Sequence, residues 1–187
     1  MLNNYFILSY LLENIKMLSQ LSLRKANNAD TDRIWEILQQ AINKRKEEGS
    51  DQWQDGYPNL DVVIDDIGNN YGYVIVENEQ QIIGYVAIID EVEPAYLELE
   101  GKWLSSGKYV VVHRLAVAQD VVIKGLGTWT MLEAEKVALS KDIKSIKVDT
   151  NFDNIGMLRV FEKLDYTYCG EVFFRGGARK AFEKLID

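Results

Sequence analysis

The sequence contains few of the residues that define several specialised classes of protein. It has one cysteine, Cys169, and one histidine, His113, among 187 residues. A single cysteine excludes an intrachain disulfide framework, and without a Cys/His cluster the sequence gives no reason to expect a metal site. A reducing compartment is therefore expected, with the cytoplasm as the natural location. A chain of this length can bury a hydrophobic core as one domain.

No apolar segment is long enough to span a bilayer. Residues 5–12 are largely apolar, but no positively charged segment precedes them and no clear cleavage site follows. We therefore expect residues 1–16 to be an N-terminal extension and residues 17–187 to form a single domain. No membrane partner is expected.

Positive charge is missing from one stretch of the chain. Residues 51–100 contain twelve Asp or Glu and no Lys or Arg, whereas residues 101–150 contain eight Lys or Arg against five acids. An acidic region attracts cationic ligands and a basic region attracts anions, although solvated surface charge explains the same pattern. No basic stripe with interleaved aromatic residues is present, so nucleic-acid binding is not expected.

Hydrophobic periodicity predicts an alternation of strands and helices. The runs at 71–77 and 81–90 predict a hairpin, and the strand–helix–strand unit over 108–150 predicts a parallel pair. We therefore expect an α/β fold with a mixed, mostly antiparallel sheet of six or seven strands flanked by helices. Residues 180–186 fit a strand or a helix, and the tight turn before them favours a strand. The remaining strands are predicted at 21–25, 145–150 and 166–174, and the helices at 31–49, 60–67, 125–140 and 154–164.

A strand, a loop and a glycine-containing turn that opens a helix form the most informative segment. The strand ends at residues 112–118, the loop covers 119–124, and residues 125–128 (GLGT) begin the helix. Free backbone N–H groups at a helix start bind phosphate, and glycine permits close approach of a ligand. Taken alone, the two glycines fit an ordinary tight turn better than a phosphate site. A dinucleotide-binding loop needs a third glycine where Thr130 stands, and the GK[ST] of a nucleotide P-loop is absent.

Two blocks of this chain resemble the GCN5-related N-acetyltransferases (GNAT family). Residues 122–127 (VIKGLG) are similar to that family's [QR]-x-x-G-x-[GA] motif, with Val122 where Gln or Arg is usual. Residues 149–154 (DTNFDN) and the helix after them resemble a strand–Asn–helix segment that ends in Y-E-K-x-G-F. Phe161 occupies the tyrosine position of that segment. The resemblance covers residues 20–187 and implies the GNAT fold.

The resemblance also implies a function, namely transfer of an acetyl group from acetyl-CoA directly to an amine. It implies that two central strands splay apart and leave backbone N–H groups for the cofactor. Helix capping is an equally good interpretation of Asn151 and Asn154. The implied cofactor-binding residues are Leu115, Ala116, Val117, Val122, Ile123, Lys124, Gly125, Leu126, Gly127, Thr128, Asn151 and Asn154.

Proton transfer needs a base for the amine and an acid for the leaving thiolate. Histidine is the residue type best suited to proton transfer near neutral pH. His113 lies on the predicted central strand, so it is the candidate for the first task; a buried structural histidine is the alternative. Phe161 cannot donate a proton, so Tyr168 and Tyr166 are the candidate acids, although both also fit packing roles. Protonation of the thiolate by solvent is the alternative.

The acceptor is expected to be a small cationic amine, because residues 51–100 are acidic. A non-catalytic CoA-binding sensor or partner module on the same fold is the competing hypothesis, favoured by Phe161 and Val122. Dimers are common in the resembled family, which leaves a homodimer open. The candidate walls of the amine site are Trp53, Gln54, Tyr57, Glu91, Glu93, Tyr96 and Trp103.

Overall fold

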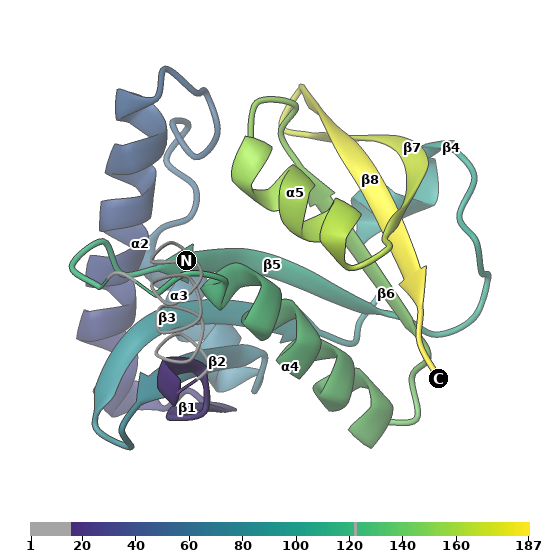
Figure 1. The fold of residues 1–187 in the computed structure, drawn as a ribbon. Coiled ribbons are helices and arrows are strands. Elements are labelled where there is room, and N and C mark those ends of the chain that lie inside the picture. The colour runs from purple at the N-terminus through teal and green to yellow at the C-terminus, as the bar shows by residue number, and fades with distance from the viewer. Residues whose placement is uncertain (1–15, 122) are drawn as a thin grey trace, which may run out of the picture.

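The computed structural model describes residues 16–121 and 123–187, so Val122 and residues 1–15 of the expected extension lie outside the described residues. Every predicted strand and helix is present within a few residues of its expected bounds (Figure 1). Within the described ranges, no helix has both the length and the apolar character needed to cross a membrane. The elements in chain order are β1 (Leu21–Lys25), η1 (Asn28–Asp30), α2 (Thr31–Glu47), α3 (Leu60–Gly68), β2 (Gly72–Glu77), β3 (Gln81–Ile89), η2 (Pro94–Glu98), β4 (Glu100–Gly101), β5 (Val110–Val117), α4 (Leu126–Ser140), β6 (Ser145–Thr150), α5 (Ile155–Lys163), β7 (Thr167–Phe174) and β8 (Gly177–Leu185).

One sheet runs through the whole molecule in the strand order β1-β2-β3-β5-β6-β8-β7-β4. Only β5 and β6 pair in parallel, and every other pairing among the described strands is antiparallel. The predicted mixed, mostly antiparallel sheet is therefore confirmed, with eight strands in place of six or seven. The additional strand is β4, where Glu100 pairs with Glu171 and Gly101 with Gly170.

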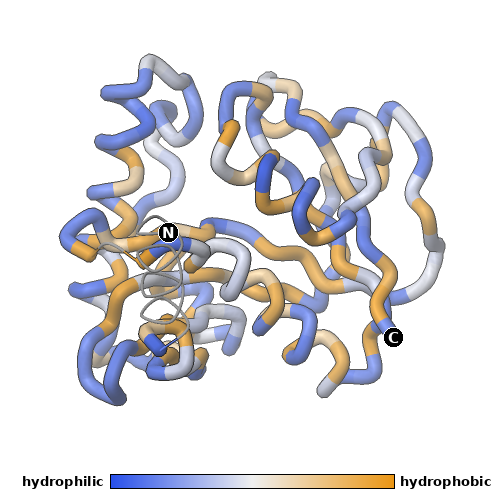
Figure 2. The backbone as a smooth tube through the Cα atoms, in the orientation of Figure 1, coloured by the Kyte–Doolittle hydropathy of each residue, from blue (hydrophilic) through white to orange (hydrophobic). Residues whose placement is uncertain are grey.

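Helices cover both faces of the sheet. On one face, Ile34 and Ile37 of α2 are buried in a cluster with Val74 of β2. On the other face, Met131 of α4 and Phe161 of α5 belong to a separate core cluster. Figure 2 shows hydrophobic residues concentrated along the strands of the sheet that lie between these helices. Because side chains alternate across a strand, the sheet has a core on each side.

The sheet opens between its two central strands. Pairing of β5 with β6 is limited to Val110 with Ile146 and Val111 with Lys147. Beyond these positions β5 continues toward α2 while β6 continues toward α5, and Figure 1 shows the two strands diverging. The splay implied by the family resemblance is therefore present, and it positions the site described next.

Candidate active site

Two cavities meet in the opening between β5 and β6. The first, here called the inner cavity, has a volume of about 240 Å³ and lies among β5, β6, α5, the β7–β8 hairpin and the loop before α3. The second, here called the groove, has a volume of about 570 Å³ and follows the end of β5 between α2 and the starts of α4 and α5. Five residues line both and mark the junction: Gln52, Trp53, Leu115, Asn154 and Met157.

A β-bulge directs consecutive residues of β5 toward the inner cavity. Residues 112–115 all line it, although successive side chains of a regular strand point to opposite faces. The register with β3 shifts here, so that Arg114 and Leu115 together stand opposite Val86. Arg114 has a left-handed backbone with φ of 55°. A bulge of this kind re-aims side chains next to active sites.

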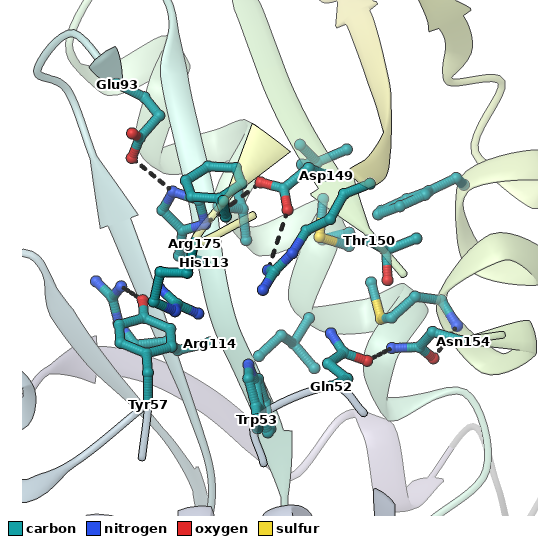
Figure 3. A pocket seen from close by; sticks show the side chains of 18 residues that line it. Gln52, Trp53, Tyr57, Glu93, His113, Arg114, Asp149, Thr150, Asn154 and Arg175 are labelled. Atoms are coloured by element: carbon teal, nitrogen blue, oxygen red, sulfur yellow. Dashed lines mark hydrogen bonds and ion pairs between the residues drawn. The ribbon is translucent and has the colours of Figure 1, made fainter. Parts of the chain in front are cut away.

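His113 lies between two carboxylates on the wall of the inner cavity (Figure 3). Its Nε2 is 3.2 Å from Glu93 Oε2, and its Nδ1 is 3.8 Å from Asp149 Oδ1. Asp149 is almost fully buried and accepts a hydrogen bond of 2.8 Å from the Tyr96 hydroxyl. The N-cap residue of η2 and the strands β5 and β6 thus bring an imidazole and two acids together.

The electrostatics of this cluster suit an imidazole that accepts a proton. Burial alone would raise the pKa of Glu93, but the hydrogen bond and charge of His113 outweigh it and the pKa is lowered. Burial and the neighbouring Asp149 raise the pKa of Tyr96, so its hydroxyl keeps its proton and donates. Glu93 and Asp149 face the two ring nitrogens of His113, an arrangement that orients an imidazole for proton transfer.

Arg114 belongs to a separate buried cluster beneath the bulge. Its Nη2 is 2.6 Å from Asp66 Oδ1 and its Nε is 2.8 Å from Asp66 Oδ2. The Tyr85 hydroxyl donates to Asp66 at 2.6 Å, and Arg114 Nη1 donates to the Tyr57 hydroxyl. Burial would lower the pKa of Arg114, but Tyr57 and Asp66 outweigh it, so the guanidinium stays charged. The cluster ties the loop that carries Tyr57 to β5.

The β7–β8 hairpin adds two more arginines to the inner cavity. Arg175 forms an ion pair with Asp55, and its Cζ lies 4.1 Å from the centre of the Tyr57 ring. Arg179 Nη1 is 3.4 Å from Asp149 Oδ2. The cavity therefore has carboxylates around His113 and guanidinium groups along the hairpin.

The groove carries five of the residues implied as cofactor-binding. α4 begins at Leu126, and its N-cap residue is Gly125, which has a left-handed φ of 83° and makes no side-chain capping hydrogen bond. Gly125 thus provides no side-chain cap for the first-turn N–H groups, and N–H groups at a helix start can bind an anion. The five residues that line the groove are Leu115, Ala116, Val117, Gly127 and Asn154.

Five of the other implied cofactor residues lie in two different environments. Ile123 and Leu126 are buried in a hydrophobic cluster that includes Ile75 of β2 and Ile83 of β3. Val122 lies outside the described residues. Three residues line a neighbouring cavity beside the first turn of α4, namely Lys124, Gly125 and Thr128.

The two asparagines differ in their contacts. Asn154 caps α5 by accepting from Met157 N at 3.2 Å, and its Nδ2 donates to Gln52 Oε1 at 3.0 Å. The capping interpretation of Asn154 is thus confirmed, and the residue lines both cavities as well. Asn151 Oδ1 is buried and has no hydrogen-bond partner among the described residues.

Three of the predicted site residues lie elsewhere. Tyr168 is 52% exposed on β7 and packs edge-on against Phe182. Glu91 is exposed, and its hydrogen bond raises the pKa of Tyr71 to about 12. Trp103 donates to the Tyr96 carbonyl at 2.9 Å and packs beneath η2. The described walls of both cavities include none of the three, whereas Trp53 and Tyr57 do line the inner cavity.

Sequence reasoning missed four charged residues of the inner cavity. Asp149 was part of a matched block, but nothing in the one-dimensional pattern showed that its carboxylate would face His113. Arg114 lies in a run of apolar residues, and that interruption was the available signal. Arg175 and Arg179 come from the far end of the chain and reach the cavity only because β8 pairs with β6.

Comparisons with known proteins identify the family and the fold. Residues 33–166 match a sequence profile of the acetyltransferase (GNAT) family. A GNAT-family acetyltransferase from Streptococcus agalactiae is 34% identical, with a TM-score of 0.80 over 89% of this chain and 96% of its own. A GNAT-family acetyltransferase from Listeria monocytogenes is 19% identical, with a TM-score of 0.71 over 89% of this chain and 95% of its own. A Salmonella typhimurium protein solved with its cofactor acetyl-CoA is 17% identical, with a TM-score of 0.64 over 90% of this chain and 95% of its own. At such identities these last two structures show the fold alone. No curated protein matches the chain.

Proposed function

The chain belongs to the GNAT acetyltransferase family, and we propose that it transfers an acetyl group from acetyl-CoA directly to the amine of a small acceptor. The observation that carries the proposal is the junction of the groove and the inner cavity at Leu115. The junction lies beyond the last paired residues of β5 and β6. A donor in one cavity and an acceptor in the other would meet there, and such positioning supplies much of a rate enhancement.

The residues around the groove suit acetyl-CoA. Beyond Val111, the edge of β5 that faces β6 has no paired strand in the described chain, so backbone groups near Leu115 are available to the pantetheine and thioester. The N–H groups that follow Gly125 are available to the pyrophosphate. The described walls of the groove and the inner cavity do not include Asn151, so no contact with the cofactor is assigned to it.

The inner cavity supplies the proton transfer that amide formation needs. When bound, acetyl-CoA supplies an activated thioester: the bond from the acceptor nitrogen to the acetyl carbon forms, the C–S bond breaks, and CoA leaves as a thiolate. The acceptor nitrogen must lose a proton, and His113 is placed to take it. Glu93 and Asp149 hold the imidazole and stabilise its positive charge. Backbone N–H groups near Leu115 stabilise the charge that develops on the carbonyl oxygen.

Two measurements test this proposal. Acetyl-CoA should raise the melting temperature in a saturable way, because it binds the folded state alone. Thiol release in the presence of a panel of primary amines should then report turnover. No stabilisation at millimolar acetyl-CoA would refute the proposal. Stabilisation without thiol release from any amine would favour the CoA-binding module, as the phenylalanine at position 161 on the cavity wall already suggests.

A further inference from the structure

The two hairpin arginines, Arg175 and Arg179, line the inner cavity rather than the groove. The groove already accounts for the proposed cofactor through backbone groups. The cavity proposed for the acceptor holds a second concentration of positive charge. This charge therefore concerns the chemical groups that the acceptor carries in addition to its amine.

Arg114 is an arginine of this cavity whose guanidinium is well satisfied by hydrogen bonds within the protein. It makes two short contacts with the Asp66 carboxylate, at 2.6 and 2.8 Å, and donates to Tyr57 as well. Its charge is compensated inside the protein, so it is not free to bind a ligand. Arg179 differs from Arg114 in its hydrogen-bond partners.

Arg179 is mostly enclosed but poorly satisfied. Its side chain is 13% exposed, and its one hydrogen bond among the described residues is the 3.4 Å contact with Asp149. Asp149 already accepts from Tyr96 and faces His113. A guanidinium has five N–H donors in a planar fork that matches a carboxylate or phosphate. Most donors of Arg179 therefore lack a protein acceptor while the residue lines the cavity.

Arg175 lies nearer to solvent on the same hairpin. It pairs with Asp55, and both side chains are about 40% exposed. Exposed ion pairs contribute little stability, so this guanidinium can exchange its partner for a ligand at low cost. Its stacking on Tyr57 fixes its position beside the cavity.

Residues 51–100 are acidic overall, but this excess of negative charge is not present on the wall of the inner cavity. Glu93 lines the inner cavity, but Asp55 and Asp66 are engaged by Arg175 and Arg114. Local charge is thus divided, with carboxylates around His113 and arginines along the hairpin. A ligand that matches both sides has an ammonium group at one end and an anion at the other. A volume of about 240 Å³ restricts it to a small molecule.

We infer that the acceptor is a small zwitterion, an amine that also carries a carboxylate or a phosphonate, and that Arg179 binds the anionic group with support from Arg175. This inference rests on the proposed acetyl transfer and specifies its substrate class. The ammonium group faces His113 and loses one proton to it, which gives the neutral amine that attacks; the second proton, released as the amide forms, passes to the leaving thiolate. Arg179 acts on the anion alone and takes no part in bond making.

Matched acceptors test the inference in the thiol-release assay. The panel consists of α-, β- and γ-amino acids, each compared with its primary amide, its decarboxylated amine and its aminophosphonate analogue. We expect the carboxylate or phosphonate form to exceed the amide in kcat/KM by about 10- to 100-fold, the factor that a charge-assisted hydrogen bond supplies. The carboxylate and phosphonate arms identify which anion the site accepts.

Arg179→Gln should reduce kcat/KM for the preferred anionic acceptor by a similar factor and leave the amide form within about threefold. Arg179→Lys should retain part of the preference, because the charge remains but the planar fork is lost. Arg159→Gln, which removes an exposed arginine of α5 outside both cavities, is the matched control. Melting temperature and acetyl-CoA binding verify that each variant is folded.

The outcomes separate this inference from the proposed function. Equal kcat/KM for anionic and neutral forms, or an equal loss for all forms in Arg179→Gln, would overturn the zwitterion while acetyl transfer stands. If every amine fails to release thiol, acetyl transfer itself is refuted. Calorimetric titration of the same amino acids into the CoA-saturated protein then decides: binding that Arg179→Gln weakens supports the anion site, and no binding of the anionic forms overturns it.

Discussion

Replacement of Asp66 by asparagine tests whether the buried Asp66–Arg114 pair holds the bulged part of β5 in place. The two side chains are 6% and 7% exposed. Asparagine preserves the shape of the aspartate but removes the charge that compensates the guanidinium. Arg114 then remains buried without a counter-ion, and breaking a buried pair from one side costs about 3–5 kcal/mol.

This loss is large for a domain of this size. Such domains unfold with a free energy of about 5–15 kcal/mol. At about 2–4 °C per kcal/mol for a chain of this length, the melting temperature should fall by about 6–20 °C. Urea unfolding followed by tryptophan fluorescence measures the free energy, and a heat scan measures the temperature. Asp65→Asn, the neighbouring exposed residue of α3, removes the same charge and should change stability by less than about 0.5 kcal/mol.

A double variant identifies the origin of the loss. Adding Arg114→Met to Asp66→Asn removes the stranded charge, so most of the lost stability should return, since replacing a buried pair by neutral groups is often tolerated. The reasoning is refuted if Asp66→Asn costs no more than about 1 kcal/mol beyond Asp65→Asn. A double variant no more stable than the single one would contradict it equally.

Three further predictions concern the base, the groove and an N-terminal ion pair. His113→Gln should lower thiol release by about 10²- to 10⁴-fold while calorimetry shows unchanged acetyl-CoA affinity; unchanged turnover would exclude His113 as the base. Gly127→Leu should weaken acetyl-CoA binding at least about tenfold by filling the groove, with little loss of stability, because a Cβ at Gly127 meets only Val160 Cγ2, at an ordinary 3.5 Å. The hydrogen bond from Arg24 lowers the pKa of Asp30 despite its burial. The ionised carboxylate therefore stabilises the folded state at pH values above the unfolded-state pKa of about 3.9, and this stabilisation is lost as the pH falls through the folded-state pKa. Asp30→Asn should therefore lower the urea midpoint at pH 7 and match the wild type near pH 2; an equal difference at both pH values would contradict the assignment.

The sequence predicted elements well where local chemistry decides them. Hydrophobic patterns located most of the long strands and helices, because burial follows directly from such patterns. For residues 180–186 the pattern fitted a strand or a helix, and the tight turn before them decided for the strand. The two-residue β4 has no pattern of its own. It forms because Gly101 and Gly170 lie back to back, where a Cβ on Gly101 would be 2.0 Å from the Cys169 carbonyl oxygen. That requirement involves residues far apart in sequence, so it was not readable in advance.

The same distinction between local pattern and long-range packing decides which site residues were predictable. Residues placed by the strand and the helix start, such as Leu115 and Gly127, lie on the groove as expected. Glu91 and Glu93 illustrate the limit: two residues apart in an irregular segment, one faces solvent and the other His113. Side-chain direction there depends on η2 and its packing beneath the sheet, which no periodicity encodes. Arg179 reached the cavity through long-range strand pairing and was equally unpredictable.

The bulge at Arg114 links stability to the proposed chemistry. Without it, His113 and Leu115 would share one face of β5 and Arg114 would take the other, yet all three line the inner cavity. The bulge requires a left-handed backbone at a residue that is not glycine, a conformation that costs free energy. The hydrogen bonds of Arg114 to Asp66 and Tyr57 are the contacts that offset this cost. Loss of Asp66 should therefore impair turnover as well as folding, even at temperatures where the variant remains folded, because the base and the thioester-binding backbone are positioned by the same bulge.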